Sequence, residues 1–153
     1  MEISILFLPL IASIIAGFFG KYIGDRNSEI LTSLFVSISA LLSIFVLYQV
    51  IVNQYEENIV IAKWINSGSL DVNWSMLIDP LSAIMLVVVT SVSSLVHIYS
   101  IGYMSHDPHK PRFMAYLSLF TFAMLMLVTS DNFIQLFFGW EGVGLCSYFL
   151  IGF

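Results

Sequence analysis

The sequence predicts an all-α integral membrane protein with about five transmembrane helices and a short β-hairpin in the loop between helices two and three. Two observations support this fold class: 59% of the 153 residues are hydrophobic while only 10% are charged, and the apolar residues form separate blocks along the chain. A soluble domain has about a quarter of its residues charged. We expect a single membrane domain over residues 1–153, with helices at about 3–20, 30–52, 80–101, 113–129 and 131–153.

The first block, Ile3 to Phe19, contains no charged residue and is long enough to cross a bilayer. A cleaved signal peptide is the competing interpretation, but such a peptide begins with positive charges and ends at a small-residue cleavage site. This chain begins Met1-Glu2, and the positive charges of Lys21 and Arg26 follow the block. We therefore expect an uncleaved span.

Capping residues stand at the starts of the later blocks. A side chain that accepts a hydrogen bond from the first turn stabilises a helix start, and proline fits the first helical position. The candidates are Asn27 or Ser28 ahead of Glu29, Asp79-Pro80, Pro111, and Ser130-Asp131-Asn132. Serines inside the second block are expected to bond to carbonyl groups of their own helix; they are Ser33, Ser37, Ser39 and Ser43.

The connection over residues 53–77 is too long for a turn and too polar to span a membrane. A largely apolar run, residues 59–65, comes before the cluster Asn66-Ser67-Gly68-Ser69, and residues 70–75 then alternate between apolar and polar side chains. Such runs on either side of a glycine-containing turn are typical of a β-hairpin.

The lysines and arginines predict how the chain is oriented. Lys21 and Arg26 lie between the first two blocks, and Lys110 and Arg112 lie between the third and fourth, whereas the opposite side has only Lys63. By the positive-inside rule, both basic loops face the cytoplasm or its equivalent, and the amino terminus and the hairpin face outward. The fifth span then runs inward.

Glu141 is the candidate functional residue. If the fifth span runs from about residue 131 to residue 153, a rise of about 1.5 Å per residue puts Glu141 near the bilayer centre. A carboxylate there costs at least about 2.5 kcal/mol, so it persists where it faces water, a partner or a proton path. Gly144, Leu145 and Tyr148 share its helix face. We expect Glu141 to gain and lose a proton; the alternative is a structural glutamate paired permanently with a basic residue.

The remaining reactive residue types are given structural interpretations. We expect His106 and His109 to be solvated in a polar loop, His97 to be packed or interfacial rather than a proton carrier, and Cys146 to be a small packing residue. The sequence contains no nucleotide-binding, CxxC, HExxH or nucleophile-elbow motif, so we expect no cofactor or metal in this chain. The net charge of −5 does not suggest binding to nucleic acid.

The last fifteen residues carry a family resemblance. Gly139-Trp140-Glu141-Gly142-Val143-Gly144-Leu145-Cys146-Ser147-Tyr148, followed by Leu150-Ile151-Gly152-Phe153, resembles the fifth-helix signature of chain 5 of respiratory complex I. This antiporter-like subunit is called subunit L in bacteria. The resemblance extends through residues 78–82, 103–108 and 130–133, so it covers essentially the whole chain. The large subunit of Mrp-type sodium/proton antiporters shares much of the signature and is the alternative.

The resemblance implies a membrane-arm component of proton-pumping NADH:quinone oxidoreductase, partnered by other membrane-arm subunits of complex I and by the lipid bilayer. It implies a proton-transfer role for Glu141, which matches the family's essential glutamate; in the family that residue pairs with a lysine on helix seven. It implies no redox chemistry in this chain, because NAD, FMN, the iron-sulfur clusters and the quinone belong to other subunits. The implied location is the mitochondrial inner membrane or the bacterial cytoplasmic membrane.

The chain differs from the family in length. It stops within or just after its fifth helix, so the helix-seven lysine and the later helices of the family have no counterpart in residues 1–153. We therefore expect the amino-terminal part of a larger antiporter-like subunit, not active alone. A structural remnant without transport activity is the alternative interpretation.

The loop charges generate a prediction about sidedness. Single cysteines introduced as Ser67→Cys and Asp107→Cys, each in a Cys146→Ser background, should react with an impermeant thiol reagent from opposite sides of the membrane. Position 67 should react from the outer side and position 107 from the side of the basic loops. Labelling of both positions from one side would contradict this topology.

Overall fold

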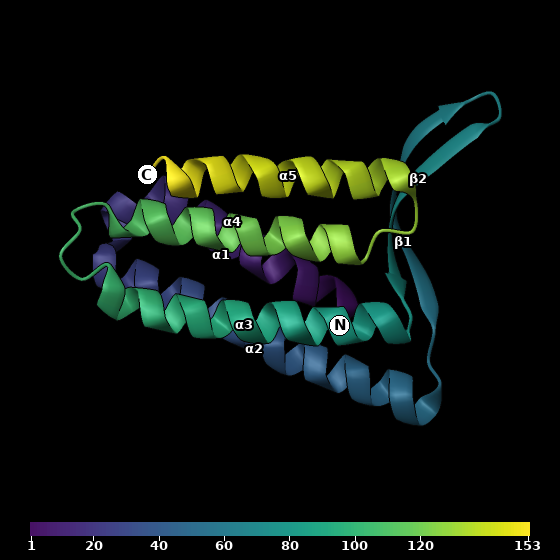
Figure 1. Cartoon of the computed structure of the whole chain (residues 1–153), viewed down its shortest axis with the longest axis horizontal. Coiled ribbons are helices and arrows are strands. Elements are labelled where there is room, and N and C mark those ends of the chain that lie inside the picture. Colours follow the sequence, from purple (N-terminus) through teal and green to yellow (C-terminus); the bar gives the residue numbers. More distant parts are fainter.

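The apolar blocks form five helices, and the polar connection forms a two-stranded sheet, in a computed structural model that describes residues 1–153 (Figure 1). The elements are α1 (Glu2–Ile23), α2 (Asp25–Asn53), β1 (Glu57–Ser67), β2 (Leu70–Ile78), α3 (Pro80–Tyr103), α4 (Lys110–Val128) and α5 (Phe133–Ile151). All five helices are long and apolar enough to cross a membrane. The predicted all-α membrane fold with a hairpin between helices two and three is therefore confirmed.

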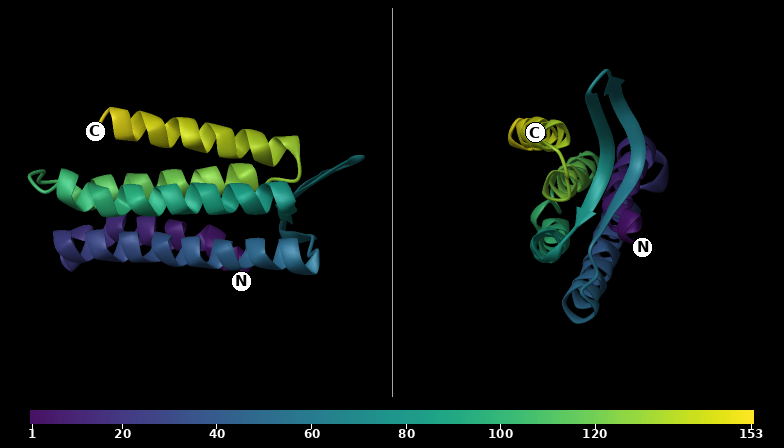
Figure 2. Two further views of the ribbon diagram at one scale, coloured as in Figure 1. Left: turned by 60° about the horizontal axis from the view of Figure 1, so that its bottom comes forward. Right: turned by 90° about the vertical axis from the view of Figure 1, so that its right-hand side faces the viewer.

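The helices run up and down beside one another. Helix α1 packs against α2 and α4, α2 packs against α3, and α4 packs against α5. Helix α5 lies at the edge of the bundle, as the end-on view shows, and makes its main helix contacts with α4 (Figure 2). Most of the surface of α5 is therefore left uncovered by this chain.

The antiparallel hairpin leaves the bundle at the end where α2 stops and α3 begins (Figure 1). Pairing runs from Glu57 opposite Ile78 to Ser67 opposite Leu70, so the turn is Gly68-Ser69. Gly68 has φ 62°, a left-handed conformation that glycine adopts without a steric penalty. Two register shifts in β1 interrupt the pairing, and each brings one extra residue into that strand.

Of the four predicted helix starts, those of α3 and α5 have the expected side-chain caps, and Pro111 lies in the first turn of α4, which begins at Lys110. Asp79 caps α3, because its carboxylate accepts from the Ser82 backbone amide at 2.6 Å while the Ser82 hydroxyl accepts from the Asp79 amide at 2.9 Å. Asn132 caps α5, because its side-chain oxygen accepts from the Gln135 amide at 2.8 Å. Both caps act within three residues, which is why a local sequence pattern predicts them.

The predicted cap of the second helix is wrong. Helix α2 begins at Asp25, and Gly24, with φ 87°, alone joins it to α1. Asn27 and Ser28 lie inside the first turns and donate backwards, to the carbonyls of Ile23 and Gly24, each at 3.0 Å. The positive φ of Gly24 reverses the chain in one residue, so no separate cap is formed.

The hydrophobic core lies at the hairpin end of the bundle, where β2 meets α1, α2, α3 and α4. Its members are Ile5, Leu6, Val46, Val50, Met76, Ile78, Ala83, Leu86, Leu125 and Met126. Hydroxyl groups connect the helices elsewhere: Ser43 bonds to Thr90 and Ser37 bonds to Ser94, each at 2.8 Å. The hairpin is thus part of the core rather than an appendage.

Polar side chains fasten the start of α5 to β2. The Gln135 amide, fully buried, donates to the Ser75 carbonyl at 2.7 Å and accepts from the Ser75 amide at 3.0 Å. Asn132 donates to the Asn73 carbonyl at 3.0 Å. These bonds give the side-chain oxygen and nitrogen of Gln135 one partner each, and they fix the position of α5 along the bundle.

Asp131 lies beside this attachment, outside the membrane-spanning segments. Partial burial by itself would raise its pKa, but hydrogen bonds outweigh that effect and hold the pKa below the ordinary value of 3.8. The donors are the side-chain amides of Asn58, at 2.9 Å, and Asn132, at 2.7 Å. The folded state thus favours the charged carboxylate.

The lowered pKa of Asp131 predicts a pH dependence of stability. The charged carboxylate stabilises the folded state above the ordinary pKa, and this contribution is lost as the pH falls through the lower pKa of the folded state. Melting temperatures measured between pH about 6 and about 3 should therefore fall less for Asp131→Asn than for the unaltered chain. Asp71→Asn, at the hairpin tip, is the control and should keep the unaltered profile. Equal profiles for all three chains would refute the assignment.

Candidate functional site

The inner face of α5 is built from small residues. A Cβ atom at Gly139 would lie 2.8 Å from the Leu127 Cα, and one at Gly142 would lie 3.2 Å from the Ala123 Cβ. Cys146 lies on the same face and is only 2% exposed. Small side chains allow two helix backbones to approach closely, so this face fixes the rotation of α5 on α4. Cys146 therefore has the packing role that was predicted.

Glu141 lies near the middle of α5. It is the ninth residue of a 19-residue helix, about 12 Å from the start and about 15 Å from the end at 1.5 Å per residue. Gly142, the next residue, faces α4, so the Glu141 side chain is turned about 100° away from that contact. Glu141 is exposed on the surface of this chain.

The surroundings of Glu141 are apolar and open. Leu145 is 54% exposed and Tyr148 is 72% exposed, and nothing lies within 4 Å of a Cβ built on Gly144. The structure contains two ion pairs, Met1 with Glu2 and His109 with Asp107, so Glu141 has no basic partner within this chain. In a bilayer the carboxylate on this face needs a partner or water from outside residues 1–153, because lipid tails cannot solvate it.

His97 is a buried histidine whose two ring nitrogens are both hydrogen-bonded. Nδ1 lies 2.7 Å from the Ser93 carbonyl, and Nε2 lies 3.0 Å from the Ser118 hydroxyl of α4. The carbonyl can only accept, so Nδ1 carries the proton and Nε2 accepts from Ser118. The structure agrees with the interpretation of His97 as a packed residue. It does not bring His97 to Glu141, because α4 separates α3 from α5 (Figure 2).

Sequence reasoning missed a second carboxylate at the basic end of the bundle. Glu29, in the second turn of α2, is 6% exposed, and its Oε1 has no hydrogen-bond partner. Ser33, one turn further on, also has a buried hydroxyl without a partner. Reasoning from the sequence treated Glu29 as a first-turn residue because it assumed a later start of the helix. It also missed Gln135, whose partners lie sixty residues earlier in the chain.

The two basic loops lie at one end of the bundle, opposite the hairpin (Figure 1). Gly20 of α1 is so close to the start of α4 that a Cβ there would be 2.6 Å from the Pro111 Cβ. At the other end, Asn58 of the hairpin bonds to Asp131 before α5. The alternation of charged loops on which the predicted orientation rests is therefore present in the structure. The side of the membrane that each end faces remains a prediction.

Comparisons with known proteins identify related chains. A family model described as NADH-Ubiquinone oxidoreductase (complex I), chain 5 N-terminus, matches residues 64–114, which run from β1 into α4. NADH-ubiquinone oxidoreductase chain 5 of Phytophthora infestans is 56% identical over 151 residues, and that of Arabidopsis thaliana is 56% identical over 153 residues. These matches include the α5 helix. They cover 99% and 100% of this chain, but 23% of each relative.

A third relative has a different name. The probable intron-encoded endonuclease 4 of Neurospora crassa is 48% identical over 153 residues, which make up 100% of this chain and 28% of that protein. The shared part is the five-helix unit described above. The chain therefore spans about a quarter of the length of the curated relatives that it matches.

The α4–α5 contact predicts opposite outcomes for two glycine substitutions in the same helix. Gly139→Ala should destabilise the fold by about 1–3 kcal/mol, because the new methyl group meets the Leu127 backbone and α5 must move away. Gly144→Ala is the matched control: its methyl group enters open space, and stability should stay equal or rise slightly through helix propensity. Thermal unfolding in detergent measures both. The packing described here would be wrong if the two variants melted alike.

Proposed function

The chain belongs to the family of NADH-ubiquinone oxidoreductase chain 5, matching its amino-terminal part, and from this premise we propose that it contributes a mid-membrane carboxylate, Glu141, to proton translocation. The observation that supports the proposal most directly is the position of Glu141. It lies halfway along an apolar helix, on an uncovered face, without an ion-pair partner in this chain.

The chemistry follows from the two states of a carboxyl group in an apolar setting. Removal from water favours the neutral acid, whereas a nearby cation or water chain favours the carboxylate. A conformational change that brings a cation toward Glu141 or withdraws it therefore releases or takes up one proton at that oxygen. Gly144 leaves space beside Glu141 for water or for a partner side chain.

The partner of Glu141 lies outside residues 1–153. By the family resemblance, it is a lysine on a later helix of the subunit, and the uncovered face of α5 is where that helix packs. Other membrane-arm subunits complete the assembly. NAD, FMN, the iron-sulfur clusters and the quinone are assigned to other subunits, and electron transfer takes place there. In this proposal residues 1–153 do not pump protons alone.

A structural role for Glu141 makes a different prediction. If Glu141 only neutralises a buried cation, Glu141→Gln leaves that cation uncompensated, at a cost of about 3–5 kcal/mol. The subunit would then be depleted from the membrane. If Glu141 is a proton-coupling group, the amide fills the same space and accepts hydrogen bonds, so assembly persists while proton uptake and release are lost.

The test compares three variants in the assembled enzyme that contains the rest of the subunit. Glu141→Gln should keep subunit abundance and lower proton pumping at least about tenfold. A positioned acid-base group typically contributes about 100-fold or more to a rate, so a loss of this size is expected. Glu141→Asp should retain part of the pumping, because a titratable carboxyl group remains. Glu56→Gln, on the exposed segment before β1, is the control and should match the unaltered enzyme.

Two measurements separate the interpretations: subunit abundance in the membrane and proton pumping per electron pair transferred. Normal abundance with normal pumping in Glu141→Gln would remove Glu141 from the mechanism. Low abundance would assign it the structural role instead.

A further inference from the structure

A pocket of about 400 Å³ lies between α1 and α4 at the basic end of the bundle. Two of the α1 residues that line the pocket, Gly17 and Gly20, have no side chain, so this part of the wall is formed by the α1 backbone. At Gly20 the two helices are in contact, and at Gly17 a Cβ would still be 3.5 Å from the Ala115 Cβ. The glycines therefore bring the helices together and leave a recess beside their contact.

The charged groups that line the pocket are mainly basic. Lys21 comes from the last turn of α1 and Arg112 from the first turn of α4, and His109 lies beside them. Asp25 is the one acidic residue in the lining. Neither Lys21 nor Arg112 makes an ion pair with Asp25 or with any other carboxylate of the chain. Two cations thus face one recess without a counter-charge bound to them.

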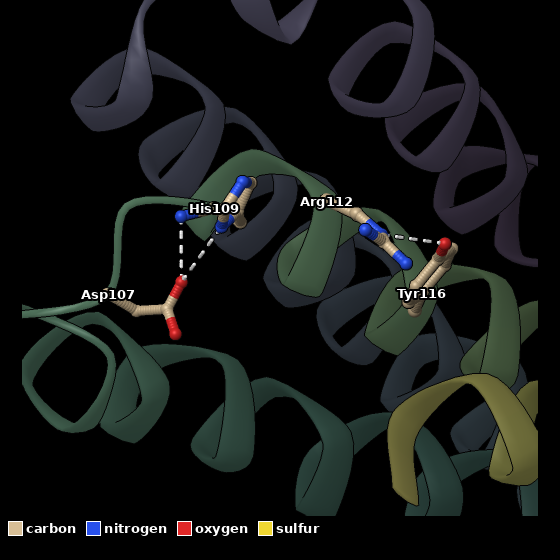
Figure 3. A network of polar contacts seen from close by, with 4 residues as sticks. All are labelled: Asp107, His109, Arg112 and Tyr116. Carbon is tan, nitrogen blue, oxygen red and sulfur yellow. Dashed lines mark hydrogen bonds and ion pairs between the residues drawn. The ribbon is translucent and has the colours of Figure 1, made fainter. Parts of the chain in front are cut away.

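Arg112 is held in place by neighbours that do not neutralise it. Its Nε donates to the Tyr116 hydroxyl at 2.9 Å, and its guanidinium carbon lies 5.5 Å from the Tyr116 ring centre and 5.6 Å from that of Phe153. Asp107 is bound to His109 instead. Its Oδ1 accepts from the His109 backbone amide at 2.7 Å and lies 4.0 Å from the His109 Nδ1 (Figure 3). The two terminal nitrogens of Arg112 remain available for an anion.

We infer that this pocket binds the phosphate group of an anionic phospholipid. A guanidinium pairs with two phosphate oxygens at once, and an ammonium adds a point charge, so Arg112 and Lys21 suit a phosphate between them. Both residues lie at the ends of membrane-spanning helices, the level at which lipid phosphates are found. Ala16, Pro111 and Ala115 also line the pocket and offer an apolar surface for the start of the acyl chains. The inference does not depend on the role of Glu141.

The probe is dioleoylphosphatidylglycerol in equimolar competition with dioleoylphosphatidylcholine, added to the full chain in a neutral detergent. Native mass spectrometry counts the two lipids retained. The anionic lipid should exceed the zwitterionic one by about tenfold, and Lys21→Gln and Arg112→Gln should each reduce this preference about fivefold. Lys63→Gln, which removes a lysine from the hairpin at the opposite end, is the matched control and should leave the preference unchanged.

Lys21 is exposed, so its variant tests the pocket even if Arg112→Gln perturbs the start of α4. Helix content from circular dichroism checks that each variant is folded. A second arm adds millimolar inorganic phosphate: persistence of the bound lipid supports the phospholipid, and its displacement would reassign the pocket to a soluble phosphate. Equal retention of the two lipids, or an equal loss in Lys63→Gln, would overturn the inference.

Discussion

The absence of hydrogen-bonding solvent inside a bilayer is the constraint on which the rest of this structure depends. The backbone N–H and C=O groups pair with one another in the helices. Most buried hydroxyls donate to a carbonyl one turn earlier or to a hydroxyl on the next helix. Both ring nitrogens of His97 are hydrogen-bonded. Glu141, in the middle of α5, has no ion-pair partner within this chain. Glu29 and Ser33 also have side-chain oxygens without a partner, but they lie buried near the start of α2. Glu141 differs from them because it lies halfway along its helix on an uncovered face.

Features set by nearby residues were predictable from the sequence. The five spans follow from apolar blocks of sufficient length, and the caps at Asp79 and Asn132 act within three residues of themselves. The second helix start was not predictable, because either a serine cap or a one-residue reversal at Gly24 is compatible with the local pattern. Packing of α1 against α2 and α4 accompanies the reversal that the chain adopts.

Features that join distant segments could not be predicted from one sequence. Ser37 and Ser43 bond to carbonyls of their own helix as predicted, and Ser33 does not. Ser37 and Ser43 also each bond to a hydroxyl of α3, which the sequence did not predict. From the sequence, Gln135 is only a polar residue in an apolar block. The structure shows that it bonds to the backbone of Ser75, sixty residues earlier. The position of Glu141 on α5 was predictable from helix geometry. A partner for Glu141 could not be predicted from residues 1–153, because no basic residue of this chain pairs with it.

The attachment of α5 to the hairpin has a consequence for biosynthesis. Residues 70–78 leave the ribosome well before residue 135, so β2 with its Ser75 backbone groups is available when α5 emerges. A helix of modest hydropathy, the lowest of the five, then meets a preformed acceptor for its buried amide at the membrane boundary. The bonds between Gln135 and Ser75 therefore tie the position of α5 along the bundle to the hairpin, and with it the position of Glu141.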